Sequence, residues 1–190
     1  MIVRNLYAGC EEANVVPKGS PGDPNYQPGN VYLTVKGGTY ENIYGGSKGT
    51  TTTPANIAGS VQLNIYGGTV TNAIYGGSHI NGSIGGSIIV NVEDKYPDDA
   101  CALDVSTATV YGGGNQADYT APVGTPNYPE VNIKNATVKA VFGGALEARV
   151  TGNPQVRIKN KAKVLGNVYG GGNLGVVNGN PKVVVNGKWE

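Results

Sequence analysis

Ile43-Tyr44-Gly45-Gly46 is one copy of the motif that decides the fold of this chain. A β-branched residue or Leu, then an aromatic residue, then two small residues recur in this order six times. The other copies are Leu6-Tyr7-Ala8-Gly9, Ile74-Tyr75-Gly76-Gly77, Val110-Tyr111-Gly112-Gly113, Val141-Phe142-Gly143-Gly144 and Val168-Tyr169-Gly170-Gly171. Successive aromatic residues are 37, 31, 36, 31 and 27 residues apart. A period of this length over the whole chain predicts a stacked-repeat architecture, which acts through an extended surface rather than one deep pocket.

Short segments of alternating apolar and polar residues precede most copies of the motif. This alternation, with many β-branched residues, predicts strands that have one buried face. The side chains expected to point inward are Val31, Leu33, Val35, Val61, Leu63, Ile65, Val90, Val131, Ile133, Val156 and Ile158. Those expected to point outward are Tyr32, Thr34, Gln62, Asn64, Asn91, Asn132, Arg157 and Lys159. Tight corners follow at Gly37-Gly38, Gly67-Gly68, Asn135 and Asn160, because Gly and Asn tolerate a positive φ.

The fold predicted from these strands is all-β, a single right-handed parallel β-helix (a β-solenoid) of about six rungs, each adding roughly 4.8 Å. A Gly-rich β-prism of the lectin type is the alternative, although near-equal repeats fit a helix better. Residues 1–190 are expected to form one domain. Because the chain begins and ends inside a repeat, we expect it to be a piece of a longer array whose neighbouring repeats would be its partners.

The composition limits the classes of function. Charged residues make up 14% of the chain and the net charge is +1, so no basic surface for nucleic acid is expected. No run of 18 apolar residues occurs, so no transmembrane helix is predicted. The two cysteines, Cys10 and Cys101, lie far apart without the spacing of a metal or redox motif. Both are expected to be unpaired thiols, and no cofactor is predicted.

The recurring aromatic residues are expected to pack at one corner of each rung, with exposed sugar-binding platforms as the alternative. The long segments between repeats are better candidates for binding. Pro24-Asn25-Tyr26-Gln27-Pro28 and Pro126-Asn127-Tyr128-Pro129 are near copies of each other, and Tyr119 lies in a third such segment. An aromatic ring beside amides suits the apolar face and the hydroxyl groups of a sugar. We therefore predict carbohydrate contacts at Tyr26, Tyr119, Tyr128, Asn25 and Asn127, with loop packing as the competing interpretation.

An acidic insert interrupts the fourth repeat. Asp94, Asp98 and Asp99 supply the hard oxygen ligands that calcium prefers, which makes them candidate metal ligands. Their spacing matches no EF-hand pattern, so a solvated polar loop is the competing interpretation. The single histidine, His79, lies in a Gly/Ser-rich loop with no evident partner in the sequence.

Two families of β-helix proteins share short motifs with this chain. Val110-Tyr111-Gly112-Gly113-Gly114-Asn115 and Phe142-Gly143-Gly144-Ala145-Leu146 resemble the Gly-rich repeats of large bacterial surface proteins, including polymorphic outer-membrane proteins. This resemblance implies export, a location at the cell surface or outside the cell, and an adhesin-like stalk or glycan-contacting role. Its implied partner is a polysaccharide or host glycan.

Asp98-Asp99 and Arg157-Ile158-Lys159 are similar to pieces of polygalacturonases. That similarity implies the alternative function, a carbohydrate-active β-helix enzyme. His79 precedes the aspartates here, whereas the family places its histidine after them. The sequence therefore favours a non-catalytic module.

Overall fold

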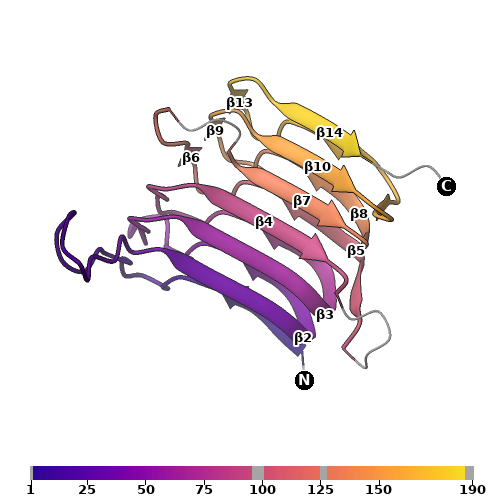
Figure 1. The fold of residues 1–190 in the computed structure, drawn as a ribbon, viewed down its shortest axis with the longest axis horizontal. Coiled ribbons are helices and arrows are strands. Elements are labelled where there is room, and N and C mark those ends of the chain that lie inside the picture. The colour runs from indigo at the N-terminus through magenta and orange to yellow at the C-terminus, as the bar shows by residue number, and fades with distance from the viewer. Residues whose placement is uncertain (1, 96–100, 125–127, 187–190) are drawn as a thin grey trace.

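The computed structural model describes residues 2–95, 101–124 and 128–186. All regular elements in this part of the chain are β-strands, and no helix occurs there. No candidate for a membrane-spanning helix is present among the described residues. Nearly every strand pairing is parallel, and eleven strands join in one large sheet that curls as it is traversed (Figure 1).

The large sheet has two sides, which we call side A and side B. Side A is formed by the first halves of β2 (Val31–Tyr44) and β3 (Val61–Tyr75), followed by β4 (Ile88–Glu93), β7 (Glu130–Lys134), β10 (Gln155–Lys159) and β14 (Lys182–Asn186). Side B is formed by β1 (Ile2–Tyr7), the second halves of β2 and β3, β5 (Leu103–Tyr111), β8 (Thr137–Phe142), β11 (Lys163–Val164) and β12 (Val168–Tyr169).

The sharp bends that separate side A from side B lie where glycine or asparagine was expected. Gly38 and Gly68 have φ values of 93° and 88° inside the long strands β2 and β3. Asn135 and Asn160 take the same role between β7 and β8 and after β10, with φ values of 52° and 55°. Because a side chain rarely tolerates this left-handed backbone, the corner residues are confirmed as the features that turn the chain.

A third side, side C, is formed by very short parallel strands and single β-bridges. It contains a three-stranded sheet of β6 (Tyr119–Thr120), β9 (Val150–Thr151) and β13 (Val177–Asn178). It also contains isolated bridges that join Val15 to Ile57 and Ile57 to Ile84. The pairing with Ile57 makes the segment around Ile84 part of side C.

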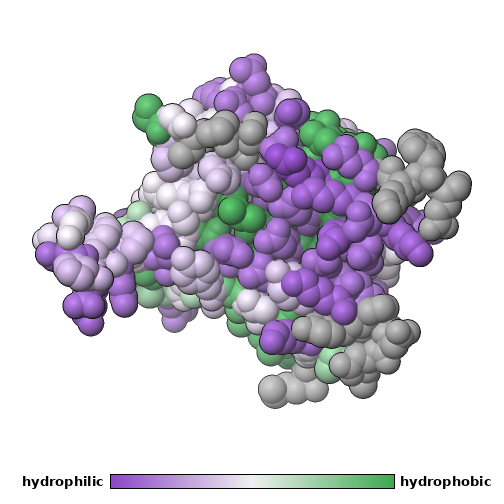
Figure 2. Space-filling view, viewed as in Figure 1, coloured by the Kyte–Doolittle hydropathy of each residue, from purple (hydrophilic) through white to green (hydrophobic). Residues whose placement is uncertain are grey.

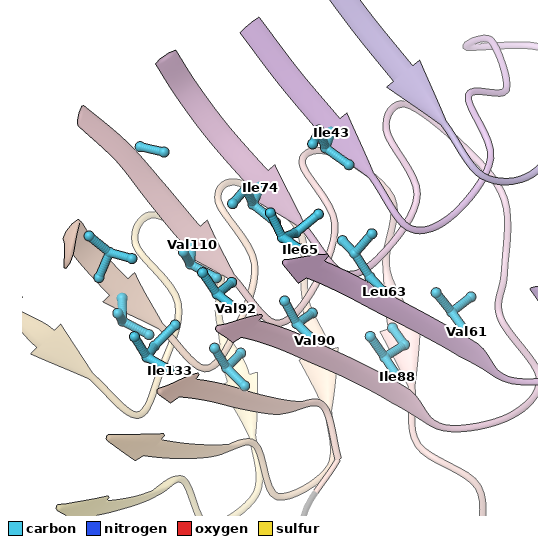
Figure 3. Packing of buried hydrophobic residues seen from close by; sticks show 14 of the residues in the cluster. Ile43, Val61, Leu63, Ile65, Ile74, Ile88, Val90, Val92, Val110 and Ile133 are labelled. Atoms are coloured by element: carbon cyan, nitrogen blue, oxygen red, sulfur yellow. The ribbon is translucent and has the colours of Figure 1, made fainter. Parts of the chain in front are cut away.

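The core lies between the sides, and its side chains come from the inward rows of the strands (Figure 3). Every residue expected to point inward is buried, except Leu33, which is partly buried and packs against the same cluster. The pairing of neighbouring strands explains this result. An inward residue of one strand lies directly beside an inward residue of the next, and such residues form one row along the stack. Leu63 pairs with Val90, Val90 with Val131 and Val131 with Val156. Identical apolar rows therefore stack on one another along the whole assembly.

Candidate functional site

The expected carbohydrate contacts at Tyr26 and Asn25 lie on a hairpin that projects from the stack (Figure 1). An antiparallel bridge between Lys18 and Gln27 closes this hairpin. Its tip is held by Asp23, whose carboxylate accepts a hydrogen bond of 2.9 Å from the Ser20 backbone N–H. Asn25 is exposed at the tip, whereas Tyr26 is half-buried.

A hollow of about 360 Å³ lies between this hairpin and side A. Tyr26 lines it from the hairpin, and Tyr32 lines it from β2. The Tyr32 side chain is 69% exposed, and its hydroxyl accepts a hydrogen bond of 2.9 Å from the Asn30 amide. Gln27 and Lys18 add further polar groups to the lining. The hollow thus combines two aromatic rings with amides and one lysine, which is a composition suited to a polar ligand.

Tyr32 was not among the predicted contact residues, because the alternation of β2 marked it only as an outward residue. The missed signal was its position. Tyr32 is the first outward residue after the Tyr26 segment, two residues beyond Asn30. A β-strand places this ring beside the root of the hairpin, so the two tyrosines could have been grouped.

Of the other expected carbohydrate contacts, Asn25, Tyr119 and Tyr128 do not line this hollow. Tyr119 belongs to the main core, with only 2% of its surface exposed, and its hydroxyl donates a hydrogen bond of 2.9 Å to the Gly86 carbonyl. It is a structural residue of side C, which corrects its assignment as a surface contact. Tyr128 is partly buried and packs against the same core, and Asn127 lies outside the described residues.

The acidic insert does not provide a metal site in the part that can be described. Asp94 follows β4 directly and is half-buried, whereas Asp98 and Asp99 lie outside the described residues. No group of three or more potential metal ligands occurs among the residues the structure describes. Cys10 and Cys101 are both free thiols, as expected.

A second, shallow groove of about 280 Å³ runs over the outer surface of side A. Its floor is a chain of side-chain amides, since Asn91 donates to Asn64 at 2.9 Å and Asn132 donates to Asn91 at 3.1 Å. These asparagines share one register row, which places each amide beside the next. Hydrophilic side chains cover much of this face (Figure 2). The alternation of the strands predicted the outward direction of these residues, but not that they would bind one another.

Each carboxylate in this groove lies within 4.0 Å of a cationic nitrogen. Glu93 lies 2.6 Å from the Lys134 ammonium, and Glu130 lies 3.8 Å from Arg157 Nε. The Lys95 ammonium lies 3.5 Å from the centroid of the Tyr66 ring, which adds a cation–π contact at the same edge. Both glutamates are thus engaged with neighbouring cations in this groove.

The recurring aromatic residues form a continuous stack along side B, and its buried rings make a cluster separate from the main core. Adjacent rings from Tyr7 to Tyr169 are stacked, with centroids 4.8–5.1 Å apart. Tyr44, Tyr75, Tyr111 and Phe142 are almost fully buried, so these rings pack and offer no sugar platform. Burial raises the pKa of the Tyr44, Tyr75 and Tyr111 hydroxyls. We call this stack the aromatic ladder.

The residues four positions after Tyr75, Tyr111 and Tyr169 each reach back to the aromatic residue two copies earlier in the chain. His79 Nδ1 shares a hydrogen bond of 2.8 Å with the Tyr7 hydroxyl, and its ring stacks on Tyr44. Asn115 hydrogen-bonds to Tyr44, and Asn173 donates to the Tyr111 hydroxyl at 3.5 Å. His79 therefore has partners that sequence analysis did not find. Burial, followed by the charge of Lys48, lowers the pKa of its imidazole.

No protein-family model matches this chain, and neither a curated protein nor a solved structure matches it.

Proposed function

We propose that the chain is a non-catalytic, right-handed parallel β-helix module of an exported bacterial surface protein, and that it contacts glycans. In this proposal, sides A, B and C close into a prism of about six rungs that holds the contact surface rigidly. The in-register parallel pairings on all three sides support the closed helix. The resemblance of the Gly-rich repeats to bacterial surface proteins supports export and the cell surface as the location.

The hollow between Tyr26 and Tyr32 is the single observation that carries the glycan contact. A pyranose ring has apolar C–H faces that pack on aromatic rings and hydroxyl groups that need amide partners. Tyr32 exposes its ring, while Asn30 and Gln27 supply amides at the margin. Exposing an aromatic ring to water is unfavourable, so a ligand that covers Tyr32 gains apolar contact.

The enzyme alternative requires two carboxylates placed on either side of a glycosidic bond. In the groove of side A, Glu93 and Glu130 are each engaged in an ion pair with a neighbouring cation rather than free to flank a glycosidic bond. A polysaccharide that binds the chain should therefore survive incubation with it. Release of reducing ends from a bound polysaccharide would overturn the non-catalytic proposal.

A glycan array followed by calorimetry tests the contact. We expect Tyr32→Ala and Tyr26→Ala to weaken binding of a hit oligosaccharide by about tenfold or more, because each removes one stacking surface. Tyr169→Ala is the matched control, since this tyrosine is also exposed but lies on the last strand of side B. Binding that is unaffected by both test substitutions, or no binding to any glycan, would contradict the proposal.

A further inference from the structure

Exposed apolar side chains gather at the two ends of the stack. The large hydrophobic residues that remain exposed at the end formed by residues 2–36 are Ile2, Val16 and Tyr32. Those at the end formed by residues 160–186 are Leu165, Tyr169, Leu174, Val176, Val183 and Val185. Among the described residues, Val123 is the one exposed large hydrophobic residue outside these ends. The middle of the stack covers its apolar rows with the next strand, whereas Val183 and Val185 on the last strand of side A stay exposed.

Both ends also present the edges of parallel sheets. At one end the outer strands are β1 on side B and the first half of β2 on side A. At the other end they are β12 on side B and β14 on side A (Figure 1). An edge strand carries N–H and C=O groups that can pair with another strand, and an apolar edge of this kind promotes association.

We propose that these two ends bind each other, so that a second copy of the chain docks head-to-tail and continues the stack. β14 and β12 of one copy would pair with β2 and β1 of the next. The contact is heterologous, because it joins two different surfaces, and it leaves the far ends free. Repetition therefore produces an open filament rather than a closed dimer.

The registers within one chain show why the two ends fit. The row that runs through Val156 ends at Val183 and begins at Leu33, and the row through Ile158 ends at Val185 and begins at Val35. A head-to-tail copy would place Val183 over Leu33 and Val185 over Val35. Both apolar rows would then continue without interruption, and both exposed valines would be covered.

The aromatic ladder continues across the same junction. Tyr169 ends the ladder and is 46% exposed, whereas Tyr7 begins it and is partly buried. In the head-to-tail register Tyr169 would stack on Tyr7 of the next copy. Within the chain, the equivalent neighbours stack at 4.8–5.1 Å.

Charge favours head-to-tail docking over the contact of two like ends. Residues 160–186 carry Lys161, Lys163 and Lys182 and no acidic residue, so two copies of this end would repel each other. In the head-to-tail register, Lys182 lies over Tyr32 of the next copy. The Lys95 ammonium already makes such a contact with Tyr66 inside the chain. The end with residues 2–36 carries both signs, including Glu11 and Glu12.

Sedimentation velocity of the whole chain without any glycan tests the inference. We expect the average mass to rise with protein concentration without reaching a limit at a dimer. Val185→Asp places a carboxylate against Val35 of the neighbouring copy. Val3→Asp places one at the opposite end, beside Val164 of the neighbouring copy. Each should weaken association by about a hundredfold. Val123→Asp is the matched control and should assemble like the unsubstituted chain.

Mixing the two blocked variants shows the direction of docking. Each variant retains one intact end, so Val185→Asp and Val3→Asp together should form a heterodimer, whereas each alone stays monomeric. Circular dichroism verifies that both variants remain folded. If one does not, Val183→Asp replaces Val185→Asp on β14, and Leu6→Asp replaces Val3→Asp on β1. A monomer at millimolar concentration, a closed dimer, or a mixture that stays monomeric would overturn the proposal.

Discussion

Replacing Tyr75 with alanine should destabilise the chain far more than the same substitution at the exposed end of the aromatic ladder. Tyr75 is 4% exposed and stacks on Tyr44 at 4.8 Å and on Tyr111 at 5.0 Å. Removal of a buried aromatic side chain costs 3–5 kcal/mol, and each stacked pair contributes about 0.5–1.5 kcal/mol of such a loss. We therefore expect Tyr75→Ala to lower the free energy of unfolding by about 4 kcal/mol, a large part of the 5–15 kcal/mol typical of a domain.

Urea unfolding followed by circular dichroism measures this loss, at a protein concentration where the chain is monomeric. Tyr169→Ala is the matched control, because Tyr169 has one stacked neighbour and is half-exposed. We expect it to cost about 1 kcal/mol. Tyr75→Phe keeps the ring and should cost less than about 1 kcal/mol. Equal destabilisation by Tyr75→Ala and Tyr169→Ala would contradict the claim that the buried, stacked rings of the ladder stabilise the fold.

Three further predictions follow from the same geometry. Gly77→Ala should cost more than about 3 kcal/mol, because its Cβ would lie 2.6 Å from the Gly114 nitrogen, whereas Gly171→Ala should be nearly neutral, since its nearest neighbour is 3.9 Å away. His79→Asn should remove part of the acid sensitivity. The folded chain lowers the pKa of His79, so the unfolded chain binds a proton more readily and stability falls as the pH drops below about 6.5. Asn135→Ala should cost about 1 kcal/mol more than Asn135→Gly, because the backbone φ is 52°.

Thermal and urea unfolding check all three. Equal effects of Gly77→Ala and Gly171→Ala would show that the corners are not in close contact. The histidine prediction compares pH 7.5 with pH 5.5, and it fails if His79→Asn loses as much stability between these values as the unsubstituted chain. The corner prediction fails if glycine is no better than alanine at Asn135.

The inward rows of side A could be predicted from the sequence because each depends on a local rule. Alternation at Val61, Leu63 and Ile65 gives the strand direction and its buried face, and all three side chains are buried. The corner residues were equally predictable, since a positive φ restricts the choice to Gly and Asn. The recurring motif also indicated that these strands stack in parallel.

The contacts between distant copies of the repeat could not be predicted by the same rules. Tyr119 looked like a loop residue, yet it lies eight positions after the aromatic residue of the preceding motif copy. The same offset applies to Val15, Val150 and Val177. That offset places all four on side C. His79 was judged to lack partners because Tyr7 is 72 residues away. The hollow at Tyr32 likewise depends on how an insert folds back on a strand, which periodicity does not specify.

The central claim is that equivalent residues of successive repeats stack at the spacing of neighbouring strands. Double electron–electron resonance between spin labels at Thr34→Cys and Val184→Cys, in a chain with Cys10 and Cys101 replaced by serine, tests it most directly. These residues share one outward row and are separated by five strand-to-strand steps. With labelled protein diluted in unlabelled protein, the account predicts a single narrow distribution centred at about 24 Å. A distribution that is broad, or centred beyond about 35 Å, would contradict a stack of parallel strands at this spacing.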